Sequence, residues 1–205
     1  MAGCFIVFEG IDGSGKSTQA RRTAERLGAL STFEPGDTPL GVELRRLLLH
    51  EDAAAPVPTA EALLMAADRA QHVHTLINPT LETGRHVVSD RFSGSTLAYQ
   101  GYGQGIDLDV LTTVVTFATG GRQPDCTILL DCDLATSKAR LGQTKPDRLE
   151  ALDTAFHERV RNGFLALGAA HQWVIIDGTD DLDAVCAAVD AAVDAAVDAA
   201  LARTS

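Results

Sequence analysis

The segment Phe5–Ala20, FIVFEGIDGSGKSTQA, joins a short apolar run to a glycine-rich motif. The run Phe5–Phe8 predicts a buried β-strand, and the residues from Lys16 onward predict a helix. The residues between them fit G-x-x-x-x-G-K-[ST], the pattern of a phosphate-binding loop. Because this loop normally lies between a strand and a helix, the flanking residues agree with the motif. The segment therefore predicts an α/β fold built around a nucleoside triphosphate site.

Each residue type in the motif has a physical role. The glycines allow backbone conformations that a Cβ hinders, so that successive N–H groups can point at an anion. The N-terminal end of the helix adds a positive partial charge. Lys16 is expected to reach the β- and γ-phosphates, and Ser17 to offer its hydroxyl to Mg²⁺. The alternative is a glycine-rich turn without a ligand, which the spacing and the flanks disfavour. The predicted triphosphate-binding residues of the loop are Gly10, Ile11, Asp12, Gly13, Ser14, Gly15, Lys16, Ser17 and Thr18.

Composition restricts the class of protein. A chain of 205 residues is long enough for one α/β domain and short for two, so we predict a single domain over residues 1–205. No apolar run approaches the roughly 20 residues of a membrane-spanning helix. The net charge of −11 disfavours a nucleic-acid polymer as partner, since such a partner requires a broad basic face. An anionic substrate must then meet a few locally placed cations.

The four cysteines and the N-terminus predict a cytoplasmic protein. No two cysteines have the spacing of metal ligands, and their apolar surroundings suggest small core residues in a reducing compartment. Met1–Cys4 has neither the basic region nor the cleavage site of a secretory signal. The cysteines are Cys4, Cys126, Cys132 and Cys186.

Apolar, β-branched runs alternate with long helix-like segments, which is typical of a parallel sheet covered on both faces. The predicted strands are Phe5–Phe8, Ala29–Phe33, His86–Ser89, Thr127–Leu130 and Trp173–Ile176. The predicted helices are Lys16–Leu27, Leu40–His50, Ala60–Glu82, Leu108–Thr119, Ala135–Leu141, Ala151–Ala170 and Leu182–Ala202. Ala53–Pro58 and Gly101–Ile106 are predicted surface loops. The four-residue Ala-Ala-Val-Asp period near the C-terminus predicts a covering helix with a frayed end and no chemistry.

Charged residues follow the third predicted strand. Ligands of such sheets bind beyond the carboxyl ends of the strands, so Asp90 and Arg91 should lie near the phosphate loop. Asp90 could hold Mg²⁺ through water, and the planar guanidinium of Arg91 suits a phosphate. The alternative is a helix N-cap followed by a solvated arginine. The strand-end position favours the functional interpretation.

A second charged segment, KARLGQTKPDRLE, contains helix breakers at Gly142 and Pro146. These residues predict a short basic flap over residues 141–150. An ordinary exposed loop has the same composition, so the residues alone leave both interpretations open. The charged residues of this segment are Arg140, Lys145, Asp147, Arg148 and Glu150.

Six motifs in register resemble those of bacterial thymidylate kinases. They are FEGIDGSGKST, EPGDTPLGVELRRLLL, AADRAQHV, VVSDRFSGSTLAYQG, PDCTILLD and DRLE, in order from Phe5 to Glu150. The resemblance implies a three-layer fold with a five-stranded parallel sheet, helices on both faces and a short lid. It also implies transfer of a phosphoryl group from ATP to dTMP, giving dTDP for dTTP synthesis, with Mg²⁺ as cofactor. Members of the family are usually homodimers, so we expect one here.

The resemblance assigns roles residue by residue. Asp12 lies between the two substrates, and Arg69 and Arg91 contact the phosphate or base of dTMP. Tyr99 packs under the deoxyribose and disfavours a 2′-hydroxyl, while Arg148 and Arg140 are the candidate lid cations. The catalytic residues are expected to be Asp12, Lys16, Arg91 and Arg148. Arg140 and Lys145 should also contact ATP, and Ser17 and Asp90 the metal. The expected dTMP-binding residues are Asp12, Phe33, Met65, Arg69, Arg91, Ser95, Thr96, Tyr99 and Gln100.

The chain departs from the family pattern at three positions. Met65 replaces the aromatic residue that usually stacks on thymine, Phe33 replaces an arginine, and Asp37 replaces a glycine. Methionine is polarizable and can pack on a ring face, so base binding need not be lost. A deoxynucleoside kinase, a GTPase and a nucleotide-binding regulatory module without turnover are the alternatives. The clustered cations favour an acceptor that already carries a phosphate. No N/T-K-x-D run that would read guanine directly follows the later predicted strands, since the one match, TKPD at residues 144–147, lies in the predicted basic flap.

Overall fold

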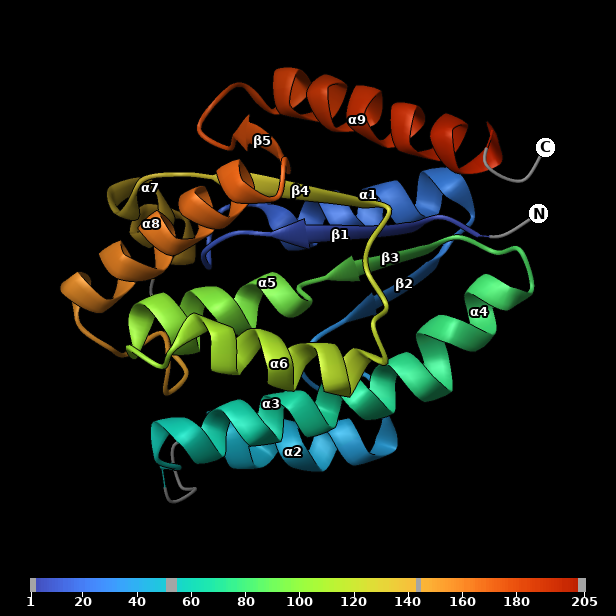
Figure 1. The fold of residues 1–205 in the computed structure, drawn as a ribbon. Helices are drawn as coiled ribbons and strands as arrows, with labels where there is room; N and C mark the ends of the chain where they lie inside the picture. Colours follow the sequence, from blue (N-terminus) through green and yellow to red (C-terminus); the bar gives the residue numbers. More distant parts are fainter. Residues whose placement is uncertain (1–2, 51–54, 143–144, 203–205) are drawn as a thin grey trace.

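The structure is a computed structural model that describes residues 3–50, 55–142 and 145–202. Five parallel strands form one sheet in the order β2-β3-β1-β4-β5, which confirms the predicted sheet (Figure 1). Each strand boundary lies within one residue of its prediction. The strands are β1 (Phe5–Glu9), β2 (Leu30–Phe33), β3 (Val87–Asp90), β4 (Cys126–Asp131) and β5 (Val174–Asp177).

Helices cover both faces of the sheet, as predicted. In Figure 1, α1 (Lys16–Leu27) and α9 (Leu182–Ala202) lie above the sheet. Below it lie α5 (Ser93–Thr96) and α6 (Leu108–Thr119), with α3 and α2 further down. The remaining helical elements are α2 (Pro39–Leu49), α3 (Pro58–His72), η1 (Val73–Ile77), α4 (Asn78–Glu82), η2 (Leu97–Gly103), α7 (Leu134–Leu141) and α8 (Thr154–Ala170).

The central strand β1 is buried along its whole length, and its side chains alternate between two cores. Ile6 and Phe8 belong to the cluster formed with α1 and α9. Phe5 and Val7 belong to the cluster on the opposite face, which includes residues of η1 and α4. This two-sided burial explains why β1 reads as a continuous apolar run.

Three helical predictions need correction. The predicted helix Ala60–Glu82 begins earlier, at Pro58, and contains the π-helical segment η1. The predicted helix Ala151–Ala170 begins only at Thr154, because the side chain of Asp153 accepts a hydrogen bond from the N–H of Phe156 and caps the helix there. The predicted loop Gly101–Ile106 is wrong in its first half, since residues 101–103 end the π-helical segment η2. In the predicted loop Ala53–Pro58, residues 53 and 54 lie outside the described part of the chain.

The C-terminal repeat forms a covering helix, as predicted. Val185, Val189 and Val193 of α9 are buried in the core beside α1. Aspartates of the repeat pair with α1, since Arg22 pairs with Asp190, and Arg26 pairs with both Asp190 and Asp194. The repeat therefore supplies an apolar face to the sheet and a charged edge to α1.

Candidate active site

The phosphate loop connects β1 to α1 and has the backbone geometry that its glycines predict. Gly13 and Gly15 have φ values of 76° and 96°, in the left-handed region that residues with a Cβ avoid. A Cβ at Gly13 would also lie 2.6 Å from the carbonyl oxygen of Ser137. Gly15 is the N-cap of α1 and has no side chain to cap the helix, which leaves room for a ligand at the start of α1. Within the first turn, the N–H of Thr18 donates to the carbonyl oxygen of Gly15 at 3.1 Å.

Arg140 lies beside this loop on the side away from β3. Its guanidinium donates to the carbonyl oxygens of Gly178, at 2.8 Å, and Gly13, at 3.4 Å. Arg140 thus reaches from the end of α7 to the segment after β5, next to a cavity that borders the phosphate loop. This cavity is lined by Ser14, Gly15, Thr18, Gln19, Leu130, Arg140, Gly178, Asp180, Leu182 and Val185.

Asp12 is the point at which the phosphate loop meets the rest of the site. Its carboxylate pairs with Lys16 Nζ at 3.1 Å and with Arg91 Nη2 at 2.6 Å, and it accepts a hydrogen bond from the Tyr99 hydroxyl at 3.0 Å. Burial alone would raise the pKa of Asp12, but the charges of Arg91 and Lys16 outweigh it and hold the pKa well below its usual range. The carboxylate therefore stays ionised and makes a poor proton acceptor.

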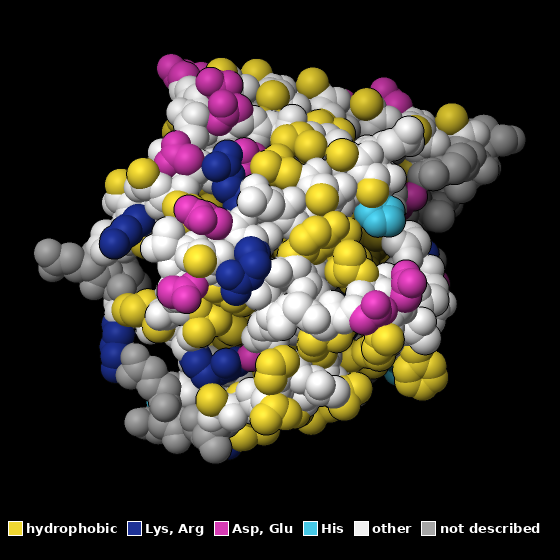
Figure 2. Space-filling view, turned by 60° about the vertical axis from the view of Figure 1, so that its left-hand side comes forward, with side chains coloured by type: hydrophobic (Ala, Val, Ile, Leu, Met, Phe, Trp, Pro, Cys, Tyr) yellow, Lys and Arg dark blue, Asp and Glu magenta, His cyan; other side chains and the backbone are white. Residues whose placement is uncertain are grey.

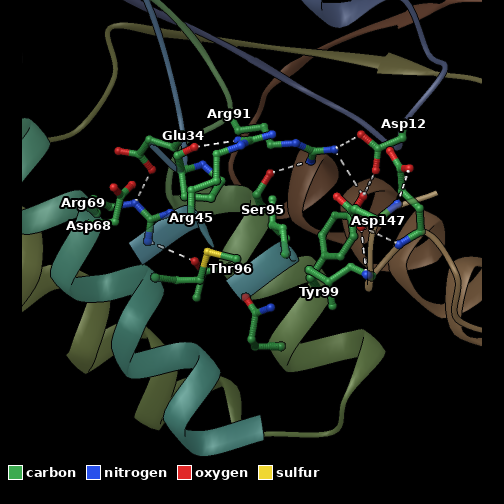
Figure 3. Close-up of a pocket in the computed structure, with 16 residues that line it drawn as sticks. Asp12, Glu34, Arg45, Asp68, Arg69, Arg91, Ser95, Thr96, Tyr99 and Asp147 are labelled. Carbon is green, nitrogen blue, oxygen red and sulfur yellow. Dashed lines mark hydrogen bonds and ion pairs between the residues drawn. The ribbon is translucent and has the colours of Figure 1, made fainter. Parts of the chain in front are cut away.

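A pocket on the β3 side shares Asp12 with the phosphate loop. Figure 3 shows the side chain of Arg91 extended across this pocket toward Asp12, with Arg69 and Glu34 at the opposite end. The lining residues come from the phosphate loop, the segments after β2 and β3, α2, α3, the α5–η2 region and the segment before α8. They are Asp12, Glu34, Pro35, Arg45, Leu49, Met65, Asp68, Arg69, Arg91, Ser95, Thr96, Tyr99, Gln100, Asp147, Leu149 and Glu150.

Arg69 is built into the wall of this pocket. Its side chain is 3% exposed, and it pairs with Glu34 at 2.8 Å. It also donates to Thr96 Oγ1 at 2.9 Å and to the carbonyl oxygen of Phe92 at 3.0 Å. Three of the five N–H groups of the guanidinium are thus used within the wall. A ligand could contact only the remaining ones.

Phe33 lies away from the pocket. Its ring is 40% exposed, and the Arg45 guanidinium lies over it at 5.7 Å from the centroid. Met65 does line the pocket and packs against the cluster that contains Tyr99. Of the two replaced positions predicted to bind dTMP, the structure brings only Met65 to the site.

Arg148 lies away from the phosphate loop. It forms an ion pair with the buried carboxylate of Glu61 in α3 and donates from Nε to the carbonyl oxygen of Leu48 at 2.8 Å. The other oxygen of Glu61 accepts from Gln100 and Gln104, each at 2.7 Å. The predicted lid cation is therefore anchored to α2 and α3. Residues 143 and 144 of the predicted lid lie outside the described residues.

The two predicted metal ligands, Asp90 and Ser17, carry oxygen atoms suited to Mg²⁺. Oδ1 of Asp90 is buried and has no hydrogen-bond partner among the described residues. The exposed hydroxyl of Ser17 lies in the first turn of α1. The described residues contain no cluster of three metal-ligating side chains. Because Mg²⁺ usually takes only one or two protein ligands and completes its shell with phosphates and water, these two oxygens fit it.

Two buried acidic residues that hold arginines of the site were not predicted. Glu34 is the partner of Arg69, and Glu61 is the partner of Arg148. These pairs join residues distant in the sequence, so no local pattern indicates them. Asp147 and Glu150 of the charged flap line the pocket together with Asp68. Glu9 was not predicted either, although it did carry a signal, because it is a charged residue at the carboxyl end of a buried strand.

A phosphate loop that shares Asp12 with a second, arginine-containing pocket defines a P-loop kinase whose acceptor is itself a nucleotide. None of the helices in the described part of the chain combines the length and apolar character of a membrane span.

The family model for thymidylate kinase matches residues 8–189. A thymidylate kinase of Synechococcus sp. (strain CC9605) is 49% identical, over 93% of this chain and 96% of that protein. One from Geobacter sulfurreducens is 45% identical, over 91% and 94%. The crystal structure of thymidylate kinase from Ehrlichia chaffeensis matches with a TM-score of 0.76 at 32% identity, covering 94% of this chain and 99% of that chain. The chain belongs to the thymidylate kinase family.

Proposed function

We propose that this protein transfers the γ-phosphoryl group of ATP to the 5′-phosphate of dTMP, giving ADP and dTDP for dTTP synthesis. ATP binds on the phosphate loop, and dTMP binds in the pocket on the β3 side. The observation that carries the proposal is the Lys16–Asp12–Arg91 contact, which joins the two sites through one carboxylate. Because both substrates are multiply charged nucleotides, which do not cross a bilayer unaided, we place the reaction in the cytoplasm.

The acceptor chemistry fits the charges of the site. The second pKa of a phosphate monoester lies near ~6, so the attacking oxygen of dTMP is already anionic at neutral pH. No general base is needed, which agrees with the low pKa and the paired state of Asp12. What is needed is compensation for two approaching polyanions, and Lys16 and Arg91 supply cations on either side of Asp12.

The remaining contacts support the proposed roles of the two substrates. Arg140 and Lys145 are proposed to contact ATP, with Gly10–Thr18 as the phosphate cradle. Arg148 remains a candidate for the transferring phosphoryl group, and it can act there only after leaving Glu61. For dTMP, the proposed contacts beyond Arg91 are Asp12, Met65, Arg69, Ser95, Thr96, Tyr99 and Gln100, all of which line the pocket.

Magnesium is the proposed cofactor, held by Ser17 and Asp90 together with the phosphates of ATP. When bound, the ion would neutralise charge on the β- and γ-phosphates and orient them. The buried, unpartnered Oδ1 of Asp90 supports this assignment.

The reaction is tested by coupled ADP release across a set of nucleoside monophosphates. We expect turnover with dTMP well above that with dCMP, dAMP and dGMP, and above that with thymidine. Turnover with thymidine but not dTMP would indicate a deoxynucleoside kinase. ATP binding without ADP release above background would indicate a regulatory module.

The Met65→Phe variant should lower the KM for dTMP several-fold and leave kcat nearly unchanged. A ring at this position would stack on the thymine face, which adds about 0.5–1.5 kcal/mol beyond burial. This contact is equally strong before and during transfer, so it affects binding only. Steady-state kinetics at saturating ATP checks the effect, with Met65→Leu as an apolar control of similar size. An effect on kcat alone would contradict the assigned contact.

A homodimer is proposed from an exposed hydrophobic face. α2 packs on α3 and α3 on α6, and the outer residues of these helices include Phe117, which is 89% exposed. Figure 2 shows hydrophobic side chains across the lower part of the molecule, where α2 and α3 lie in Figure 1. Patches of this kind mark association surfaces. The exposed hydrophobic residues of these helices are Leu40, Val42, Leu47, Leu63, Val110 and Phe117.

The Phe117→Asp variant should convert the dimer into a monomer. A carboxylate at the centre of a hydrophobic interface would be buried without a partner, which strongly disfavours association. Sedimentation velocity at micromolar concentration distinguishes the two states. A wild-type protein that is itself monomeric would exclude the dimer, and a dimeric variant would exclude this face as its interface.

A further inference from the structure

Glu9 is a buried carboxylate at the end of the central strand β1, and the proposed reaction gives it no role. Its side chain has no exposed surface, and the four preceding residues of β1 are all hydrophobic. A charge buried in such a place is unfavourable unless hydrogen bonds satisfy it. Its hydrogen bonds therefore indicate why an acidic residue occupies this position.

All of the donors to Glu9 come from the turn that follows β3. Oε1 accepts from the backbone N–H groups of Phe92 and Ser95, each at 3.0 Å. Oε2 accepts from the hydroxyl of Ser95 at 2.6 Å. Gly94 in the same turn approaches so closely that a Cβ there would lie 2.9 Å from Oε1. Glu9 thus fixes the first turn of α5 against the end of β1.

Arg91, next to this turn, has an unfavourable backbone conformation. Its φ is 74°, in the left-handed region that residues with a Cβ seldom adopt. Its N–H donates to the carbonyl oxygen of Phe8 at 2.8 Å, and its own carbonyl oxygen accepts from Ser89 Oγ at 2.7 Å. The next N–H along the chain, that of Phe92, is the one that donates to Glu9. Glu9 therefore stabilises the chain on the C-terminal side of Arg91.

The side chain of Arg91 is linked to Glu9 as well. Nη1 donates to Ser95 Oγ at 2.9 Å, while Nη2 donates to Asp12 at 2.6 Å. A serine hydroxyl has one proton, and here the proton points to Oε2 of Glu9, which leaves an oxygen lone pair for Arg91. A protonated Glu9 could instead donate to Ser95. The serine proton would then turn toward the guanidinium and oppose the bond from Nη1.

We propose that Glu9 is a positioning residue, which in its ionised form holds Arg91 in the direction needed to bind the phosphate of dTMP. The proposal rests on the proposed role of Arg91 as a contact of that phosphate. Glu9 itself touches neither substrate. It acts through the Ser95 hydroxyl and through the backbone of the turn.

The charge of Glu9 changes within the physiological range of pH. Burial raises the pKa of Glu9 to about 7, although the Ser95 hydrogen bond and the charge of Arg91 oppose the increase. The other charged groups that act on Arg91 are Asp12 and Asp90, and Asp125 and His171 line the cavity that Glu9 also lines. Since the pKa is raised, Glu9 loses its charge as the pH falls through about 7. The affinity for dTMP should then fall with it.

The test is the pH dependence of the KM for dTMP in the wild-type protein and the Glu9→Gln variant, between pH 6 and pH 8.5. Between pH 8 and pH 6 the ionised fraction of a group with a pKa of about 7 falls about tenfold. The wild-type KM should therefore rise up to about tenfold beyond the change caused by the dTMP phosphate itself. The Glu9→Gln variant should have a high KM for dTMP over the whole pH range. Its KM should change with pH only as the phosphate of dTMP titrates. The KM for ATP should follow neither trend.

Asp68→Asn is the control, because Asp68 lines the proposed dTMP pocket, which Glu9 does not, and burial raises the pKa of Asp68 to about 6. This variant should keep the wild-type pH dependence above pH 7. If the pH dependence of the KM for dTMP instead disappears in Asp68→Asn and persists in Glu9→Gln, the proposal is wrong. A wild-type KM that changes only as the phosphate titrates would also overturn it.

Two further measurements keep the outcome unambiguous. If Glu9→Gln does not fold, Ser95→Ala removes the hydroxyl between Glu9 and Arg91 and should raise the KM for dTMP with a weaker pH dependence. If no turnover of dTMP occurs, the proposed function fails, and calorimetric titration with dTMP still shows whether binding follows the charge of Glu9. Normal turnover with a KM that is insensitive to Glu9→Gln would reject the positioning role alone.

Discussion

Replacement of Lys16 by alanine should lower kcat by about 10²–10³-fold, the usual cost of losing a group that stabilises charge in the transition state. Lys16 Nζ lies 3.1 Å from Asp12 at the phosphate loop, and it is the cation that the loop motif itself directs at the β- and γ-phosphates. Charge moves toward the bridging oxygen during transfer, so a cation fixed there acts more strongly on the transition state than on bound ATP.

The fold should survive this change. Lys16 is 4% exposed, but its ammonium group pairs with the ligand-facing Asp12, which keeps its second partner, Arg91, in the variant. Arg26→Ala is the matched control, because it removes a cation from the same helix whose ion pairs within the described residues are with Asp190 and Asp194. This control should retain the wild-type kcat. Near-normal turnover by Lys16→Ala, with the fold verified by circular dichroism, would show that the phosphate loop is assigned wrongly.

The sheet could be predicted because its signal is local. The central strand β1 is buried on both faces and therefore reads as a continuous apolar run. The edge strands β2 and β5 are partly exposed, and β2 is marked only by its short length and β-branched or aromatic residues. The phosphate loop is equally local, since its glycines, its lysine and its hydroxyl residues lie within nine positions. The strand order was not predicted, because contacts between residues far apart in the sequence determine it.

The helical segment α5–η2 could not be predicted, because its glycines resemble those of a loop. Gly103 lies in η2 where that segment packs on α8, and a Cβ there would lie 2.6 Å from the ring of Phe156. A Cβ at Gly163 of α8 would similarly lie 2.6 Å from Tyr102. These glycines allow two helices to approach closely. Tertiary packing therefore requires these glycines, and the neighbouring sequence does not reveal that requirement.

The partners of the predicted arginines were unpredictable for the same reason. Arg148 lies 87 positions from Glu61, and Arg69 lies 35 positions from Glu34. The sequence indicates that these arginines belong to the site, but both are held by buried carboxylates in this structure. Arg91 differs from them, because its carboxylate partner Asp12 is itself part of the phosphate loop.

The Arg91→Ala variant should raise the KM for dTMP about 10- to 100-fold and leave the KM for ATP nearly unchanged. A hydrogen bond to a charged group contributes about 1.5–3 kcal/mol, which corresponds to this range of affinity. Loss of Arg91 also leaves Asp12 with one cationic partner fewer, so that its negative charge repels the incoming phosphate more strongly. Both effects weaken the binding of dTMP, the phosphate acceptor, and neither acts on ATP.

Arg91→Lys separates the two contributions of the arginine. A lysine keeps a positive charge near Asp12 but loses the planar fork that can hold a phosphate while it contacts Asp12, Ser95 and Gly10. We therefore expect a KM for dTMP between those of the wild type and Arg91→Ala. The KM for dTMP is measured from initial rates with dTMP varied at saturating ATP. The KM for ATP is measured with ATP varied at saturating dTMP. Equal increases in both constants would place Arg91 in the ATP site, and the shared carboxylate of Asp12 would then join two parts of one substrate rather than two substrates.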